Sequence, residues 1–143
     1  MVQFYERNDA HIVVAATENI RQNILRGLAY VIDSHVLGGS RVYDDWKDLN
    51  PDGVDYDYNY YFYADRADSV YLTNEKRAFV EAYAMTFPHE DRCLLLAYAM
   101  MDGNSAYFTS DTMQAKLSAG CQGIRDAYDV DGEDLPWEQY LAE

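Results

Sequence analysis

The sequence has few of the residues that build metal, redox and nucleic-acid sites. Its 143 residues include two cysteines, three histidines and three prolines, and its 11 basic residues stand against 25 acidic ones, giving a formal charge of -14. No apolar run approaches the roughly 20 residues that cross a bilayer, and the first residues lack the basic and then apolar pattern of a signal peptide. We therefore expect no membrane span, and the negative charge disfavours binding to a nucleic-acid backbone.

Catalytic motifs that need few residues are also missing. Cys93 and Cys121 lack the CxxC spacing of a zinc ribbon or a thioredoxin-type site. We expect two buried thiols; the alternative is a disulfide between packed helices, which requires an oxidising compartment. Ser34 and His35 are adjacent but would not face each other on a helix, and there is no G-x-S-x-G elbow or glycine-rich phosphate loop.

What the sequence does contain predicts one mainly α-helical domain over residues 1–143, with little or no β-sheet. Residues 10–16 are a short β-prone run. Helices are expected over roughly 18–37 and 74–86, then from a cap at Thr86 to a stop at Asp102-Gly103, and from Ser110 or Asp111 to Tyr128, with a last short helix near Pro136. In the first helix, the apolar spacing predicts a core-facing stripe, with Arg26 and Asp33 on or near its flank: Ile20, Ile24, Leu28, Val31 and His35.

Between residues 40 and 74 the sequence is rich in aspartate and tyrosine and poor in aliphatic residues, which predicts a long ordered loop. Five of its tyrosines, interleaved with Asp55 and Asp57, are a candidate binding surface: Tyr56, Tyr58, Tyr60, Tyr61 and Tyr63. Aromatic rings beside negative charge suit a cationic peptide, a protein or a carbohydrate. The alternative is that most of these rings pack the loop onto the helices.

Several short motifs keep a fixed order over most of the chain, from about Ile12 to Tyr128. They are Ile32-Asp33, Tyr43-Asp44-Asp45-Trp46-x-x-Leu49-Asn50-Pro51-x-Gly53-x-x-Tyr56, Ala84-Met85-Thr86-x-Pro88-x-Glu90-Asp91-Arg92, Tyr98-Ala99-Met100, Gln114-x-Lys116-Leu117 and Ile124-Arg125-x-Ala127-Tyr128. The set resembles a family of bacterial zinc metallopeptidases with a zincin fold, whose members carry an HExxH-x-x-D helix, a DDW/NP loop and a Pro-x-Glu-Asp helix start. The resemblance implies a zincin-like domain, and because family members are often secreted or lipoprotein-anchored, an extracytoplasmic location is a hypothesis.

Such peptidases hold zinc with two histidines four residues apart on a helix, and a glutamate beside the first histidine activates the bound water. The resemblance places Arg26 and Tyr30 at the two histidines, Gly27 at the glutamate and Glu90 at the third metal ligand. A guanidinium cannot bind zinc, glycine offers no base and a neutral phenol is a poor ligand. The resemblance therefore implies a vestigial site, without zinc and without catalysis.

Loss of the metal would leave Glu90 as a partly buried charge. We predict that Arg26 approaches Glu90 and forms a fork-shaped ion pair in the space that the metal would occupy. The alternative is that Arg26 extends into solvent. The expected function is that of a metallopeptidase-like domain kept as a non-catalytic binding or interaction module, with no cofactor.

Two alternatives retain a metal. An active zinc metallopeptidase would need atypical ligands such as His35, His89 and Glu90, and a separate histidine-based metal site would need His11, His35 and His89. A calcium-stabilised domain would use Asp48 to Asp55, which matches the D-x-N-x-D-G start of a calcium loop, although Asn59 replaces the bidentate glutamate at its twelfth position.

Overall fold

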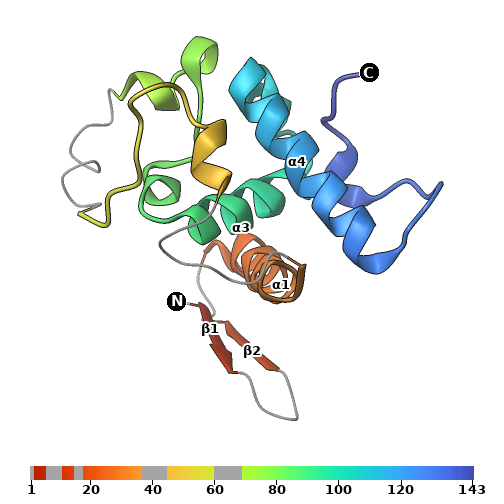
Figure 1. Cartoon of the computed structure of the whole chain (residues 1–143). Coiled ribbons are helices and arrows are strands. Elements are labelled where there is room, and N and C mark those ends of the chain that lie inside the picture. The colour runs from red at the N-terminus through yellow and green to blue at the C-terminus, as the bar shows by residue number, and fades with distance from the viewer. Residues whose placement is uncertain (1, 6–10, 15–17, 37–44, 60–68) are drawn as a thin grey trace.

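The computed structural model describes the chain except for residues 1, 6–10, 15–17, 37–44 and 60–68. Its main elements are strands β1 (Val2–Tyr5) and β2 (His11–Val14) and helices α1 (Ile20–Val36), α3 (Pro88–Ala99) and α4 (Asp111–Tyr128) (Figure 1). Within the described residues, six 3₁₀ helices join them: Asp45–Leu49, Val70–Leu72, Asn74–Lys76, Ala82–Met85, Ser105–Phe108 and Pro136–Glu138. The mainly helical fold class is confirmed, and the zincin-like assignment stays a prediction.

The β-structure of the described residues is one antiparallel pair. β1 and β2 align Val2 with Val14 and Tyr5 with His11. The predicted β-prone run at 10–16 therefore contains a strand, while the sequence analysis missed its partner β1. Both strands contact α1, and Figure 1 shows the pair projecting from the side of the molecule on which α1 lies.

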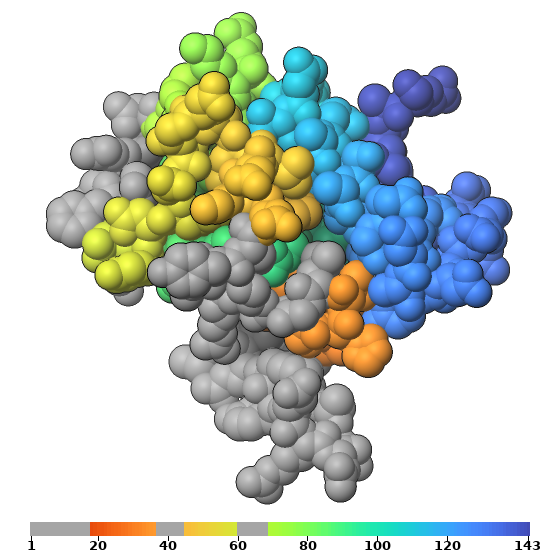
Figure 2. All heavy atoms as spheres, in the orientation of Figure 1, coloured from red at the N-terminus to blue at the C-terminus, as the bar shows by residue number. Residues whose placement is uncertain are grey.

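Helix α3 is the centre of the packing. It contacts α1, α4 and the 3₁₀ helices Ala82–Met85 and Pro136–Glu138, and ten of its twelve residues are buried. In Figure 2 the segment 45–59 and α4 cover most of α3 on the visible face. The predicted cap, Thr86, is wrong by one residue: Phe87 is the N-cap, and Pro88 stands at the first position, where proline's fixed φ and missing N–H cost nothing. Its start is consequently held from several sides.

The predicted core face of α1 is wrong. Ile20, Ile24 and Leu28 are 44%, 50% and 42% exposed, and His35 is exposed as well. The buried residues of α1 are instead Gly27, Ala29 and Asp33. The physical reason is that α1 packs against the charged start of α3, which requires polar partners and small residues for a close approach. Hydrophobic periodicity located the helix but not the side that faces the core.

The predicted helix over 74–86 is also wrong. The 3₁₀ helices Asn74–Lys76 and Ala82–Met85 are separated by a non-helical stretch that contains the buried Phe79 and Val80. Backbone N–H groups of Ala78 and Phe79 donate to the Tyr71 carbonyl, and the Ala78 carbonyl accepts from Lys116 Nζ at 2.7 Å. Tertiary partners thus take the backbone groups that an α-helix would pair within itself.

Helix α4 follows its sequence pattern closely. Ser110 caps it by accepting a hydrogen bond from the Met113 N–H, and four members of the predicted stripe are buried: Met113, Leu117, Cys121 and Ile124. Tyr128, the fifth, is 45% exposed.

Cys93 and Cys121 are both free and buried, so the expected buried thiols are confirmed. Burial raises the pKa of Cys121 to about 12 and that of Cys93 well above its usual value.

Candidate functional site

Three consecutive charged residues, Glu90 to Arg92, lie at the end of the first turn of α3 and at the start of its second turn. Glu90, Asp91 and Arg92 are all buried, with exposed fractions of 5%, 0% and 3%. Successive positions on a helix point in directions about 100° apart, so each side chain meets a different part of the molecule. Ionised side chains are buried only when each has a charged or hydrogen-bonding partner, and each of the three has one here.

Glu90 meets Arg26 and Tyr30, which lie one turn apart on the same face of α1. Arg26 Nη2 donates to Glu90 Oε2 at 2.5 Å, and the Tyr30 hydroxyl donates to Glu90 Oε1. Arg26 Nη2 also donates to the Tyr30 hydroxyl at 3.3 Å. The Arg26–Glu90 ion pair expected from the sequence is therefore confirmed. It uses one guanidinium nitrogen rather than a fork, and Arg26 Nε has no hydrogen-bond partner in the described part of the chain.

The surroundings of this pair favour its charged form. Burial by itself would raise the pKa of Glu90, but a hydrogen bond from His89, the charge of Arg26 and the hydrogen bond from Tyr30 together hold that pKa below its usual value. Burial and the neighbouring Glu90 charge raise the pKa of the Tyr30 hydroxyl, which stays protonated and donates. Arg26 stays protonated because Glu90 and Tyr30 outweigh the effect of its burial. The three side chains form one charge-compensated cluster.

Aromatic rings enclose the guanidinium of Arg26. Its Cζ lies 4.8 Å from the ring centroid of Tyr83 and 5.6 Å from that of Tyr30. Contact of a cation with ring faces at these distances is attractive. Gly27, the residue next to Arg26, is buried and contributes no side chain. The described residues that meet here are a cation, a phenol and one carboxylate, with His89 beside that carboxylate.

Asp91 is the centre of a second, largely buried cluster that the sequence analysis missed. Its Oδ2 accepts hydrogen bonds from Lys116 Nζ at 2.6 Å, the Tyr56 hydroxyl at 2.7 Å and Trp46 Nε1 at 3.0 Å. Lys116 has no exposed surface, and its ammonium also lies 4.0 Å from the ring centroid of Phe79. Burial lowers the pKa of Lys116 despite the neighbouring carboxylate. This cluster joins α3, α4 and the segment 45–59.

Arg92 completes the trio by pairing with Asp33 of α1. Its Nε donates to Asp33 Oδ1 and its Nη2 to Asp33 Oδ2 at 3.2 Å, so this buried pair is bidentate. The Asp33 side chain, placed on the flank of α1 by the sequence analysis, is 3% exposed. Asp33 and Arg26 lie seven residues apart and together fix α1 against α3.

The tyrosines of the candidate binding surface lie in different surroundings. The hydroxyl of the partly buried Tyr56 points inward and donates to the buried Asp91. Tyr58 is 73% exposed and stacks on Phe87 with a ring-centroid distance of 6.3 Å and an angle of 10°. The remaining candidates fall outside the described residues: Tyr60, Tyr61 and Tyr63. Within the described ranges, the candidate surface is therefore reduced to Tyr58.

The alternative metal ligands lie in different surroundings. His35 stacks with Tyr128 of α4 at a centroid distance of 6.1 Å, whereas His89 lies beside Phe87, Tyr30 and Glu90. The His11 side chain falls outside the described residues. Over the described ranges, no group of three or more His, Cys, Asp or Glu side chains lies close enough together to hold a metal ion.

The calcium-like segment forms a tight turn. Gly53 has a φ of +78°, and the Val54 N–H donates to the Pro51 carbonyl at 3.0 Å. The glycine is therefore needed for backbone geometry, as both a calcium loop and an ordinary turn would require. Calcium binding stays an untested alternative.

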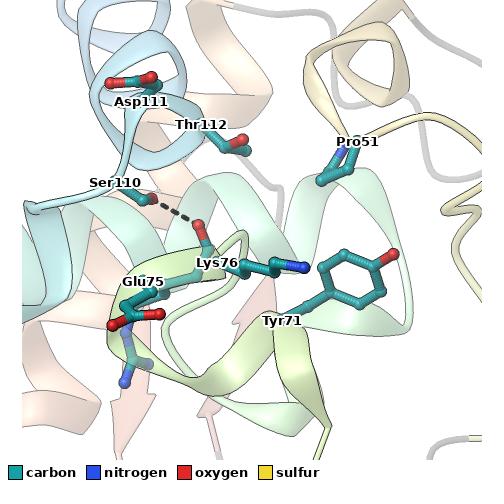
Figure 3. Close-up of a pocket in the computed structure, with 8 residues that line it drawn as sticks. Pro51, Tyr71, Glu75, Lys76, Ser110, Asp111 and Thr112 are labelled. Atoms are coloured by element: carbon teal, nitrogen blue, oxygen red, sulfur yellow. Dashed lines mark hydrogen bonds between the residues drawn. The ribbon is translucent and has the colours of Figure 1, made fainter.

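A pocket of about 350 Å³ lies away from these clusters, between the turn after Asp45–Leu49, the 3₁₀ helices near residue 75 and the start of α4 (Figure 3). Both charge signs line it, and Figure 3 shows Ser110 Oγ bonded to the Arg77 carbonyl. Its lining residues are Pro51, Tyr71, Glu75, Lys76, Arg77, Ser110, Asp111 and Thr112.

Comparison with protein-family models, with curated proteins and with solved structures found no match for the chain. Within the ranges that the structure describes, no helix has both the length and the apolar character needed to cross a membrane. Function must therefore be argued from the clusters themselves.

Proposed function

We propose that this chain is a metallopeptidase-like domain that has lost its zinc site and acts as a non-catalytic binding module. One observation supports it above the others: Arg26 and Tyr30, four residues apart on α1, both bond to the carboxylate of Glu90 on α3. Two side chains at this spacing and one carboxylate from another helix are also the arrangement of a zinc-peptidase ligand set. Here a guanidinium supplies the positive charge that a metal would supply.

The replacements are chemically consistent with one another. A buried carboxylate needs a compensating cation, and the guanidinium of Arg26 supplies one at 2.5 Å. Because that guanidinium stays protonated, it repels a divalent cation from the same space. A zincin-like origin explains why the cation, the phenol and the carboxylate converge at this position, and why Gly27 stands where a catalytic glutamate would be needed.

Restoring the two histidines should create a zinc site. We expect Arg26→His/Tyr30→His to bind about one zinc ion per chain, with Glu90 as the third ligand, because two imidazoles four residues apart on a helix suit tetrahedral zinc. Zinc should also raise the melting temperature of this variant, since the metal replaces the lost guanidinium. Elemental analysis after dialysis and thermal unfolding with and without a chelator measure both effects.

The matched control is Arg21→His/Leu25→His, which places two histidines at the same spacing on α1 but outside the Glu90 cluster. It should bind zinc much more weakly, and adding Glu90→Gln to the first variant should weaken its zinc binding. The proposal is wrong if the unaltered protein retains stoichiometric zinc and cleaves peptides in a chelator-sensitive reaction. It is equally wrong if the two histidine pairs bind zinc alike.

We place the binding function at Tyr58. Among the described residues its ring is the most exposed of the large apolar side chains, and it stacks on Phe87, while Asp55 and Asp57 are near it in sequence. A rigid exposed ring beside carboxylates suits a cationic chain through cation–π and charge attraction. A short oligolysine peptide is a suitable probe for binding at this surface.

Tyr58→Ala should weaken oligolysine binding about fivefold to tenfold, because a cation–π contact at an exposed site contributes on the order of 1 kcal/mol. Titration calorimetry at low salt measures the change. Tyr128→Ala, which removes a 45% exposed tyrosine at the end of α4, is the control and should leave binding unchanged. Absence of binding, or an equal loss in both variants, would contradict the assignment of the surface.

A further inference from the structure

The pocket at the start of α4, about 350 Å³ in volume, has the size of a small-molecule site. Two of its lining residues are held in place by hydrogen bonds within the protein. Ser110 Oγ donates to the Arg77 carbonyl at 2.5 Å and accepts from the Met113 N–H at 3.2 Å. The Arg77 guanidinium donates to the carbonyls of Phe79 and Val80 at 3.3 and 3.4 Å. This part of the pocket is therefore formed before a ligand arrives, which lowers the cost of ordering it on binding.

In the described part of the chain, Arg77 lacks the carboxylate partner that the other arginines have. Those other pairs are Arg21–Asp102, Arg26–Glu90, Arg92–Asp33 and Arg125–Glu138. Arg77 bonds instead to two carbonyl oxygens and the Asn74 side chain, and its buried Nε has no hydrogen-bond partner among the described residues. Burial lowers the pKa of Arg77, whereas at Arg26 the neighbouring Glu90 outweighs the effect of burial. The pocket thus contains a positive charge without a counter-ion.

Lys76 brings a second positive charge to the same pocket. Figure 3 shows its side chain extending toward the ring of Tyr71, on the side where Pro51 lies. The ion pairs of the described residues do not include Lys76. The two lining carboxylates, Glu75 and Asp111, lie on the opposite side in the same view. One side of the pocket is therefore cationic with an apolar wall, and the other side is anionic.

We propose that this pocket binds a dipeptide with free ends and an aromatic C-terminal residue. The carboxylate of the ligand pairs with Lys76, and its aromatic side chain lies against Tyr71 and Pro51. The ammonium of the ligand lies at the side of Glu75 and Asp111. Because the lining charges of opposite sign are on opposite sides, the ligand must have separated charges, which a dipeptide has and a single amino acid does not.

A multiply charged anion fits this pocket less well. Two lining carboxylates and the formal charge of -14 on the chain repel a phosphate group, whereas a zwitterion has no net charge to be repelled. The pocket lies apart from the Glu90 cluster, so this inference does not depend on the proposed loss of zinc.

Titration of the isotope-labelled whole chain with alanyl-phenylalanine, followed by amide chemical shifts, tests the proposal. The shifts should change at Tyr71, Lys76 and Thr112, with a dissociation constant in the millimolar range, because a ligand of this size makes few contacts. Its C-terminal amide and its N-acetyl form each lack one charge and should bind about threefold more weakly or worse. Added salt should weaken binding of the unmodified dipeptide, since the pairs are partly exposed.

Two lysine variants locate the carboxylate of the ligand. Lys76→Met should raise the dissociation constant about threefold or more and should remove the difference between the dipeptide and its amide. Lys47→Met is the matched control, because Lys47 is also an exposed lysine and does not line the pocket. It should leave binding unchanged, and circular dichroism should show that both variants fold.

The variant Glu75→Gln/Asp111→Asn tests the other side of the pocket. It should remove the difference between the dipeptide and its N-acetyl form, while the amide stays the weaker ligand. Three results would overturn the proposal: chemical shifts that do not change at the pocket, an amide that binds as tightly as the dipeptide, or equal binding by Lys76→Met and Lys47→Met.

Discussion

Lys116→Met is expected to lower the free energy of unfolding by about 3–5 kcal/mol, because it leaves the carboxylate of Asp91 buried without a cation. Neither residue of the pair has exposed surface, so water cannot replace the lost ammonium. The methionine keeps most of the volume of the lysine chain, so cavity formation contributes little. Urea unfolding followed by circular dichroism measures the change, with equal m-values showing that the unfolding transition is the same.

Neutralising the partner should reverse much of this loss. In Lys116→Met/Asp91→Asn the side chain at 91 carries no charge, yet its amide oxygen can still accept from Tyr56 and Trp46, whose bonds to Asp91 measure 2.7 and 3.0 Å. The double variant should therefore be more stable than Lys116→Met alone. Burial lowers the pKa of Lys116 even beside a carboxylate, as expected for a buried ion pair in which desolvation offsets much of the attraction between the charges.

The control for this series is Arg21→Met. Arg21 Nη2 lies 4.0 Å from Asp102 Oδ2, but both side chains are mostly exposed, so the ion pair contributes little. We expect no measurable change in unfolding. If Lys116→Met were as stable as Arg21→Met, the pairing of Lys116 with Asp91 would not be what holds α3, α4 and the segment 45–59 together.

The elements that the sequence predicts well are those with strong local signals. The start of α3 is marked by Pro88 and the start of α4 by Ser110, and in both the physical preference operates within one helical turn. The apolar row of α4 is also predicted, because four of its five members face one continuous core. Local chemistry is sufficient in these cases since no distant partner competes with it.

The segments that the sequence predicts badly are those that distant partners decide. The face of α1 that packs on α3 is chosen by the pairing of Arg26 and Asp33 with charges 64 and 59 residues away. Residues 77–81 have helix-compatible side chains, but the Ala78 carbonyl is bonded to Lys116. The spacing of hydrophobic residues contains no information about such pairings. Where a helix carries aliphatic residues on its exposed face, that spacing predicts the wrong face as buried.

The candidate site was predictable in one part and missed in another. The Arg26–Glu90 contact could be anticipated because the resemblance places both residues around one metal position. The Asp91 cluster could have been suspected from Lys116 alone. This lysine lies three residues after Met113 and one before Leu117, within the buried row of α4, and a charged residue in such a row needs a buried partner. The identity of that partner came from the fold.

Arg26→Met is expected to lower the free energy of unfolding at neutral pH by about 2–3 kcal/mol, less than a fully buried pair would lose because water reaches the Arg26 side chain. The exposed fraction of that side chain is 21%, against 7% for Glu90. Stability is lost because the buried carboxylate of Glu90 would keep only two hydrogen-bond donors, Tyr30 and His89, and no cation. Adding Glu90→Gln should restore part of the stability, since a neutral amide needs no cation. Urea unfolding of the four proteins in this cycle gives the coupling energy.

The pH dependence of the same variants identifies Glu90 as the cause. The folded-state pKa of Glu90 lies below its ordinary value of 4.5, so its ionised form contributes stability that is present above that pH and is lost as the pH falls through the folded-state pKa. Without Arg26 the pKa of Glu90 should rise, because burial then acts with less opposition. The stability difference between the unaltered protein and Arg26→Met should therefore shrink on acidification from neutral pH to about pH 4. A difference that stays constant across this range would mean that Arg26 stabilises the fold through its contacts with Tyr83 and Tyr30, and not through the charge of Glu90.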